Sequence, residues 1–277
     1  MKALPQAHST SLSETRKPQS LRQHLARQSS WLAVLSFALA VLIWALVAQW
    51  GSLPAFILPS PAAVWQRFVQ VLMDGTLLRN SLVTLSEVLL GLLIGSVLAT
   101  VIGYGLAKSH SMEKILSPFL VASQAVPTVA IAPLLVIWFG PGMISKVIIC
   151  ALTVFFPILV NTIIGIQAVP ESLHDLMKSM RATRLQTLRY LEVPAALPVL
   201  FGGMRIGATL SVIGAVVGEF VGSDRGLGFL INVGRGQFDT ALVFVALFML
   251  ILLAILLYST AYVAEKRVLR WKPGNNH

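Results

Sequence analysis

Residues 82–107 read LVTLSEVLLGLLIGSVLATVIGYGLA, a run of 26 residues whose one charged side chain is Glu87. A helix of about 20 largely apolar residues is long enough to cross the roughly 30 Å hydrocarbon core of a bilayer. This run satisfies both conditions, so it predicts a transmembrane helix.

The composition of the whole chain agrees with this interpretation. The 277 residues are 56% apolar and 12% charged, with a mean hydropathy of +0.80. Soluble domains carry about 25% charged residues, and half that charge cannot cover a water-facing surface. A soluble globule, a disordered chain and a disulfide-rich secreted scaffold are excluded, the last because Cys150 is the only cysteine. Five further apolar runs predict a total of six spans, namely 31–50, 115–139, 144–169, 195–221 and 241–264.

The Lys and Arg residues predict the orientation of these spans. With the N-terminus inside, 15 of the 21 fall on the cytoplasmic side and five on the other side. Cytoplasmic loops of membrane proteins carry such an excess, so we expect both termini inside. The same asymmetry explains the net charge of +10 without a nucleic-acid partner. We expect a disordered cytoplasmic tail over 1–30, a six-helix domain over 31–270 and a short cytoplasmic tail over 271–277.

Four residues within the predicted spans are candidates for a pathway or gate. Arg205 is charged near the start of the fifth span, and its long side chain can also reach the interface. Glu219, at the outer end of that span, can cap or anchor its helix or line an outer gate. Pro127 bends the third span, and this bend can either line the pathway or be a kink without a role in transport. Asn161 is a polar residue in the fourth span.

Small residues recur four apart in two of the spans. Gly91 and Gly95 form one such pair, and Gly203 and Gly207 form another. Glycines at this spacing let helix backbones approach closely in lipid. The pattern indicates helix packing, and it leaves open whether the packed surface includes a dimer seam or a translocation path.

The most informative cytoplasmic segment is the loop 170–195. Its apolar residues recur at i, i+3, i+4 and i+7, which is one face of a helix, while a second apolar stripe over 185–191 ends at Pro194. We expect two short helices whose apolar stripe docks against a partner or against the membrane surface. The first stripe consists of Leu173, Leu176, Met177 and Met180, with Asp175 and Arg181 beside it.

The sequence contains no motif for chemistry of its own. It has no GxxxxGK[ST] phosphate loop, no HExxH and no GxSxG, and its five histidines are scattered. We therefore expect no catalytic site, no cofactor and no metal. An intramembrane enzyme would need a nucleophile with a base, or clustered acidic or His residues within the spans, and the sequence shows neither. An ion-coupled carrier usually needs more helices or repeated broken segments, and Glu87 and Glu219 alone give it little support.

The loop 170–195 resembles the EAA loop of the permease subunits of binding-protein-dependent ABC importers. Aligning the conserved proline of that loop with Pro194 puts Asp175 at its Glu, Leu176 and Met177 at its alanines and Arg181 at its Gly. Arg181 replaces the Gly of the turn between the two short helices, and Arg adopts the positive φ that such a turn favours only poorly. Longer stretches resemble one branch of these permeases, namely 124–140 (QAVPTVAIAPLLVIWFG), 155–170, 193–220 and 226–231 (GLGFLI).

This resemblance implies an all-α integral membrane permease of the bacterial inner membrane, with a cytoplasmic coupling helix between its fourth and fifth spans. It implies that a second permease copy completes the pathway, most simply as a homodimer in membrane lipid. It also implies a cytosolic ATPase that binds Leu173, Asp175, Leu176, Met177, Met180 and Arg181, and an extracytoplasmic binding protein. The stretches 177–183 and 213–220 resemble the pyrimidine-precursor and riboflavin importers more than the sulfonate importers. This resemblance implies a pyrimidine (thiamine-precursor) or riboflavin-like substrate, and nitrate, alkanesulfonates or taurine are the alternative.

The orientation can be tested by single-cysteine labelling. In a Cys150→Ala background, we expect an impermeant thiol reagent on intact cells to label a cysteine at Gln237 and not one at Ser179, because only the former is predicted to lie outside. Permeabilised cells should label both positions. Equal labelling of the two in intact cells would contradict the topology.

Overall fold

A computed structural model describes residues 19–50, 54, 56–109, 115, 118, 122 and 127–270. The chain divides into two units, Met1–Leu53 and Pro54–His277. In the first unit, α1 (Gln19–Trp50) is one continuous helix. Residues 19–30, which we expected to belong to a disordered tail, are its first turns, and 1–18 lie outside the described residues. Leu, Gln, Arg and Ala favour helix, and extending an existing helix needs no new nucleus.

In the second unit, the described residues form helices joined by turns, with no strand among them. A short helix, α2, follows the first predicted span and is capped by Ser60, whose hydroxyl accepts a hydrogen bond from the Ala63 N–H at 3.2 Å. The elements are α2 (Pro61–Met73), α3 (Thr76–Ala107), α5 (Thr128–Phe139), α6 (Met143–Gln167), α7 (Glu171–Ser179), α8 (Arg184–Thr187), the π-helix η1 (Leu188–Glu192), α9 (Val193–Gly222), α10 (Leu227–Gly236) and α11 (Thr240–Val268).

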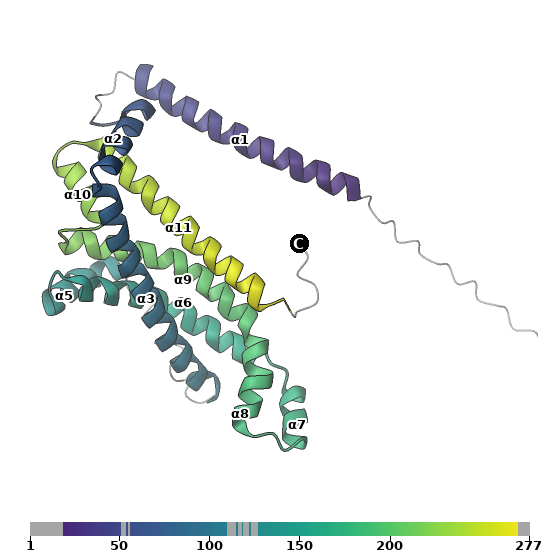
Figure 1. Ribbon diagram of the computed structural model, residues 1–277. Coiled ribbons are helices and arrows are strands. Elements are labelled where there is room, and N and C mark those ends of the chain that lie inside the picture. The colour runs from purple at the N-terminus through teal and green to yellow at the C-terminus, as the bar shows by residue number, and fades with distance from the viewer. Residues whose placement is uncertain are drawn as a thin grey trace, which may run out of the picture. The chain divides into compact units, whose positions relative to one another are not determined.

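The centre of this unit is α6, which packs against both α3 and α9, while α11 lies along α9 (Figure 1). One apolar cluster joins α3 to α6 and consists of the buried residues Ala99, Leu106, Val154, Ile158, Leu159 and Ile163. A smaller cluster joins α5 to α6 through Ala132, Leu135 and Ile149. The outward faces of α3 and α11 remain apolar and exposed, as expected for surfaces that lie in lipid.

The predicted glycine pairs do mediate close helix packing. A Cβ atom on Gly91 would lie 2.2 Å from the Cβ of Cys150, and one on Gly95 would lie 2.7 Å from the carbonyl oxygen of Ala151. From the other side, a Cβ on Gly214 of α9 would lie 2.9 Å from the Cα of Cys150. Glycine is therefore required on both neighbours of α6 at the level of Cys150.

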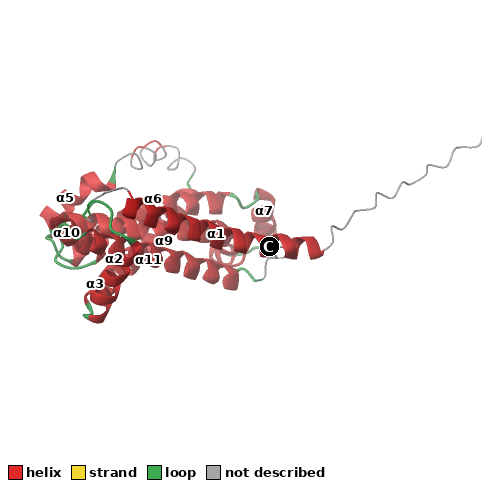
Figure 2. Ribbon diagram, turned by 90° about the horizontal axis from the view of Figure 1, so that it is seen from above, coloured by secondary structure: helices red, strands yellow, loops and turns green. Residues whose placement is uncertain are grey.

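The two ends of the bundle carry different short elements. Figures 1 and 2 show α7 at one end and α10 with α2 at the other. Since the loop that contains α7 joins α6 to α9, and α10 joins α9 to α11, the chain alternates between the two ends as the predicted topology requires.

Within the described residues, four helical segments are long and apolar enough to span a membrane. They are Thr76–Ala107, Met143–Gln167, Arg184–Gly222 and Thr240–Val268. Two shorter apolar helices, Ala38–Trp50 and Thr128–Phe139, fall within the predicted first and third spans. Six spans therefore stay a prediction. Within the third run, α5 follows Pro127, and most of 110–126 lies outside the described residues.

The second predicted coupling-loop helix is not a separate helix. Instead of ending at Pro194, α8 continues through η1 into α9, so that 184–222 is one uninterrupted helical segment. Pro194 lies in the first turn of α9, directly after the π turn. Proline lacks the N–H that an α-helix uses and crowds the preceding turn, and a wider π turn accommodates both effects.

Two glycines of α3 provide a matched test of the packing. We expect Gly95→Ala to destabilise the protein by about 1–3 kcal/mol, because the added methyl meets backbone of α6 that cannot move aside. Gly105→Ala lies on the same helix with nothing within 4 Å of the new methyl, so its better helix propensity should raise stability slightly. Thermal unfolding of the purified variants in detergent measures both, and an equal effect of the two substitutions would contradict the packing.

Candidate coupling site and translocation pathway

The apolar stripe of the predicted coupling helix is exposed in the structure. It lies on α7, and Leu173, Leu176 and Met180 are 40%, 52% and 70% exposed, while Met177 is half-buried. The helix is strongly amphipathic, because charged residues occupy its other faces. Three large apolar side chains on one short exposed helix are costly in water, so this face is suited to docking.

Arg181 ends α7 in the left-handed conformation, with φ of 56°. The Ala182 N–H donates to the Met177 carbonyl at 3.0 Å, and the Arg181 N–H donates to the Lys178 carbonyl at 2.9 Å. This pair of hydrogen bonds is the Schellman motif, in which the left-handed position is normally glycine. The turn thus keeps the geometry that glycine favours, at the cost of about 1–2 kcal/mol for the Arg side chain.

Asp175 is paired along the exposed surface of α7. The Lys178 ammonium donates to the Asp175 carboxylate at 2.9 Å, and both side chains are mostly exposed. This hydrogen bond raises the pKa of Lys178 above its ordinary value. An exposed pair of this kind contributes little to stability. Both charges therefore remain available at the edge of the apolar stripe.

A buried carboxylate, which the sequence analysis did not single out, attaches α7 to the bundle. Glu192 is 1% exposed and accepts hydrogen bonds from the Tyr104 hydroxyl at 3.0 Å and from the Lys108 ammonium. The His174 imidazole Nε2 lies 3.2 Å from the same carboxylate. Tyr104 and Lys108 come from the end of α3 and His174 from α7, so Glu192 joins three segments. Its signal in the sequence is an acid two residues before Pro194, at the junction of the loop and the fifth apolar run.

The predicted pathway residues do not converge on one site. The Asn161 side-chain amide donates to the Pro157 carbonyl at 2.8 Å. Asn161 also packs against Gly203, where an added Cβ would lie 2.8 Å from the Cβ of Asn161. Arg205 forms an ion pair with Glu265 of α11 at 3.1 Å. Pro127 is exposed beside the start of α5.

Glu219 lies in a buried polar cluster at the α10 end of the bundle. It is fully buried and accepts hydrogen bonds from the Thr84 hydroxyl at 2.6 Å and from the Gly228 N–H. Beside it, Lys146 of α6 lies 3.4 Å from the carboxylate of Glu87 and is 3% exposed. The cluster ties α3, α6, α9 and α10 together. Lys146 is one of the five basic residues that the charge count assigned to the outer side, and the structure shows it as a buried partner of these acids.

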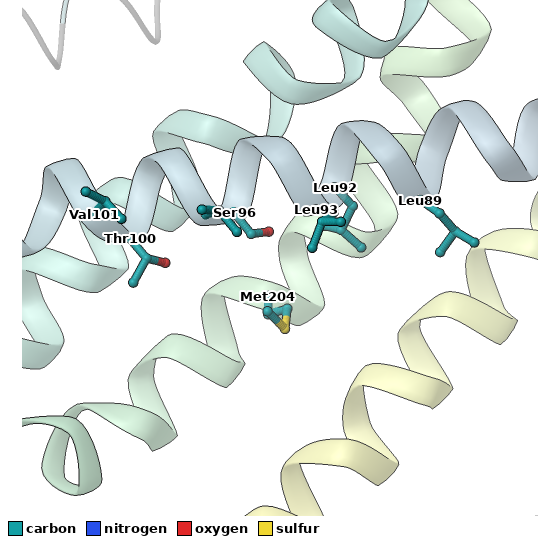
Figure 3. A pocket seen from close by; sticks show the side chains of 8 residues that line it. Leu89, Leu92, Leu93, Ser96, Thr100, Val101 and Met204 are labelled. Carbon is teal, nitrogen blue, oxygen red and sulfur yellow. The ribbon is translucent and has the colours of Figure 1, made fainter. Parts of the chain in front are cut away.

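A largely apolar pocket of about 620 Å³ lies along α3, with Met204 of α9 on its other side (Figure 3). Its lining contains two hydroxyl residues, Ser96 and Thr100, and no charged residue. The buried Ser96 hydroxyl has no hydrogen-bond partner among the described residues. None of the four predicted pathway residues lines this pocket, which the apolar sequence of α3 did not distinguish from lipid-facing surface. The remaining lining residues are Leu89, Leu92, Leu93, Val97 and Val101.

The structure is thus a helical bundle with long apolar helices and one short, exposed amphipathic helix, α7. The chain belongs to the family of binding-protein-dependent transport system inner membrane components, whose model matches residues 91–270. It is therefore the permease subunit of an ABC importer of the inner membrane, and a partner ATPase hydrolyses the ATP. The family also implies an extracytoplasmic substrate-binding protein.

Individual relatives refine this assignment. The chain is 47% identical over 238 residues to the riboflavin transport system permease protein of Chloroflexus aurantiacus, covering 86% of this chain and 89% of the relative. It is 35% identical over 238 residues to the formylaminopyrimidine transport permease protein of Halalkalibacterium halodurans, covering 86% and 94%. It is 29% identical over 247 residues to a putative aliphatic sulfonates transport permease protein of Bacillus subtilis, covering 89% and 90%.

Among solved structures, the fold matches the inward-facing methionine ABC transporter MetNI. The TM-score is 0.60 at 20% sequence identity, and the match covers 72% of this chain and 96% of that chain. This similarity concerns the fold. It agrees with the helical architecture that the resemblance of the loop and spans implied.

The Schellman turn gives a prediction of opposite sign at two arginines. Arg181→Gly should strengthen protection of the Ala182 amide in hydrogen exchange, because glycine relieves the left-handed strain, whereas Arg181→Val should weaken it. At Arg189, which is exposed and helical, the order of the two substitutions should reverse: Arg189→Gly should disrupt the helix more than Arg189→Val. A loss of Ala182 protection in Arg181→Gly would contradict this description of the turn.

Proposed function

We propose that the chain imports a flat, largely uncharged aromatic compound, a riboflavin-like molecule or a pyrimidine precursor of thiamine. The observation that carries this proposal is the pocket beside α3, whose walls are apolar with two hydroxyls and no fixed charge. An apolar wall with a few hydroxyls suits an aromatic ring with polar edges, whereas a sulfonate or nitrate anion would favour basic groups. The riboflavin and formylaminopyrimidine permeases among the relatives support the same substrate class.

Import of nitrate, alkanesulfonates or taurine is the second candidate. The observation that favours it is the likeness to sulfonate and taurine permeases at 28–29% identity. Arg205, the basic residue that an anion would need in the fifth span, is already paired with Glu265. We therefore rank this candidate below the first.

In the proposed assembly, two copies of the chain form the pathway as a homodimer in membrane lipid. Each copy has six spans with both termini in the cytoplasm, and the apolar segments Ala38–Trp50 and Thr128–Phe139 belong to the first and third of these spans. The charge asymmetry of the sequence supports this orientation, with α7 inside and α10 outside.

In the proposed mechanism, α7 is the coupling helix. Its apolar stripe docks into a groove of the ATPase, with Asp175 and Arg181 at the rim of the contact. Closure of the ATPase pair on ATP then moves α7, and the bundle shifts between inward-open and outward-open states. Pro127, Asn161, Arg205 and Glu219 remain candidates for residues whose packing changes between these states.

Uptake by the reconstituted importer tests the substrate. With the permease, its ATPase and its binding protein in liposomes, we expect ATP-dependent uptake of labelled riboflavin or hydroxymethylpyrimidine, and little uptake of taurine. Liposomes that lack ATP provide the background. Uptake of taurine alone would overturn the proposed substrate class.

Leu176→Asp tests the coupling role of α7. The substitution removes an apolar contact worth about 1.5–3 kcal/mol and places an acid in the docking groove, so we expect ATPase co-purification and transport to be lost while the permease still inserts in the membrane. Leu185→Asp, at a still more exposed leucine on α8, is the control and should retain both. Wild-type co-purification and transport in Leu176→Asp would rule out α7 as the coupling helix.

A further inference from the structure

A second pocket, of about 670 Å³, lies on the side of α7 that faces the bundle. None of the four residues of the apolar stripe lines it, so docking of an ATPase on that stripe does not fill the pocket by itself. The walls come from three separate parts of the chain: the end of α3, the inner face of α7, and the α8–η1 segment. The polar residues that the argument uses are Tyr104, Lys108, His174, Lys178, Arg184 and Glu192.

One wall of this pocket is fixed by the buried carboxylate of Glu192. Tyr104, Lys108 and His174 all contact that carboxylate, which is 1% exposed. Their side chains are therefore held in place before any ligand arrives. This makes the wall a built feature rather than a chance grouping of surface lysines.

The pocket carries more positive than negative charge. Lys108 balances Glu192, and His174 contacts the same carboxylate. Lys178 lines the mouth and is paired with Asp175, whose exposed side chain is not part of the lining. Arg184 has no ion-pair partner among the described residues and also lines the pocket. The lining therefore holds three permanent cations against one carboxylate, which favours an anionic ligand.

The position of the pocket indicates which anion. Residues 88–107 of α3 include no charged side chain, and Lys108 follows directly, so the pocket begins where the second span ends. Lys and Tyr at the end of a span mark the level of the lipid headgroups. Basic pockets between helices on the cytoplasmic side bind the phosphate groups of anionic lipids.

We propose that this pocket binds the phosphate headgroup of an anionic phospholipid of the inner leaflet, with Lys178 and Arg184 as its principal ligands. This inference rests on the proposed function, because it needs the α7 end of the bundle to lie at the cytoplasmic membrane surface. The bound headgroup bridges α3, α7 and α8, so it holds the coupling helix at a fixed angle to the bundle.

The test uses the full-length permease purified with its ATPase in a neutral detergent. Native mass spectrometry measures retention of added phosphatidylglycerol, with phosphatidylcholine as the zwitterionic comparison. We expect preferential retention of phosphatidylglycerol, which 10 mM inorganic phosphate does not displace. Each basic residue near an anionic membrane surface contributes about fivefold in affinity (about 1 kcal/mol), so Lys178→Gln combined with Arg184→Gln should reduce retention about twenty- to thirtyfold.

Arg189→Gln is the matched control, because Arg189 is an exposed arginine of the same helical segment that does not line the pocket. It should retain phosphatidylglycerol as the wild type does. Equal retention of the two lipids, displacement by inorganic phosphate, or equal losses in Arg189→Gln and in the double variant would each overturn the lipid site. Lipid retention is measured without transport, so a failure of coupling or of substrate uptake is seen separately, in ATPase co-purification and in liposome uptake.

Discussion

The fold depends on how closely α3 and α9 approach α6 from its two sides. At Cys150 and Ala151, glycines of α3 and α9 bring backbone against backbone, and a single added methyl on any of them would overlap atoms of α6. In a bilayer there is little hydrophobic drive to hold helices together, so close van der Waals contact of this kind supplies much of the association. The three helices therefore form one packed unit.

Buried charges fix those two ends. At the α10 end, Lys146 forms an ion pair with Glu87 beside Glu219, and Glu219 accepts a hydrogen bond from the Gly228 N–H. At the α7 end, Glu192 plays the corresponding part for Lys108 and His174. Removing one partner of such a cluster leaves a buried charge without compensation, which costs several kcal/mol. Each cluster thus restricts which arrangements of its short helix the bundle tolerates.

Local patterns in the sequence predicted the parts of this structure that depend on period and composition. The apolar runs predicted the long helices, the four-residue spacing of glycines predicted the tight packing of α3, and the stripe from Leu173 to Met180 predicted α7. The contacts that depend on distant partners were not predictable in this way. Lys146 lies at the start of the predicted fourth span, and nothing in its local sequence indicates Glu87 as its partner. Glu192 and Lys108 are likewise far apart in the sequence and meet only because α3 packs beside η1. Pro194 wrongly predicted a helix end, because the π turn before it lets the helix continue through the proline.

The continuity of α8, η1 and α9 bears on how motion of α7 reaches the pathway. Because no loop interrupts 184–222, a displacement at its α8 end is carried along a rigid helix to the α6 packing surface. α7 itself touches this helix through His174 and Glu192, and α3 joins the same carboxylate through Tyr104 and Lys108. In the proposed coupling mechanism, a push on α7 would therefore act on α3 and α9 together, and these two helices line the apolar pocket, for example through Ser96 of α3 and Met204 of α9. The π turn lies directly at this junction, where its wider hydrogen-bonded ring accommodates Pro194 and keeps the segment continuous.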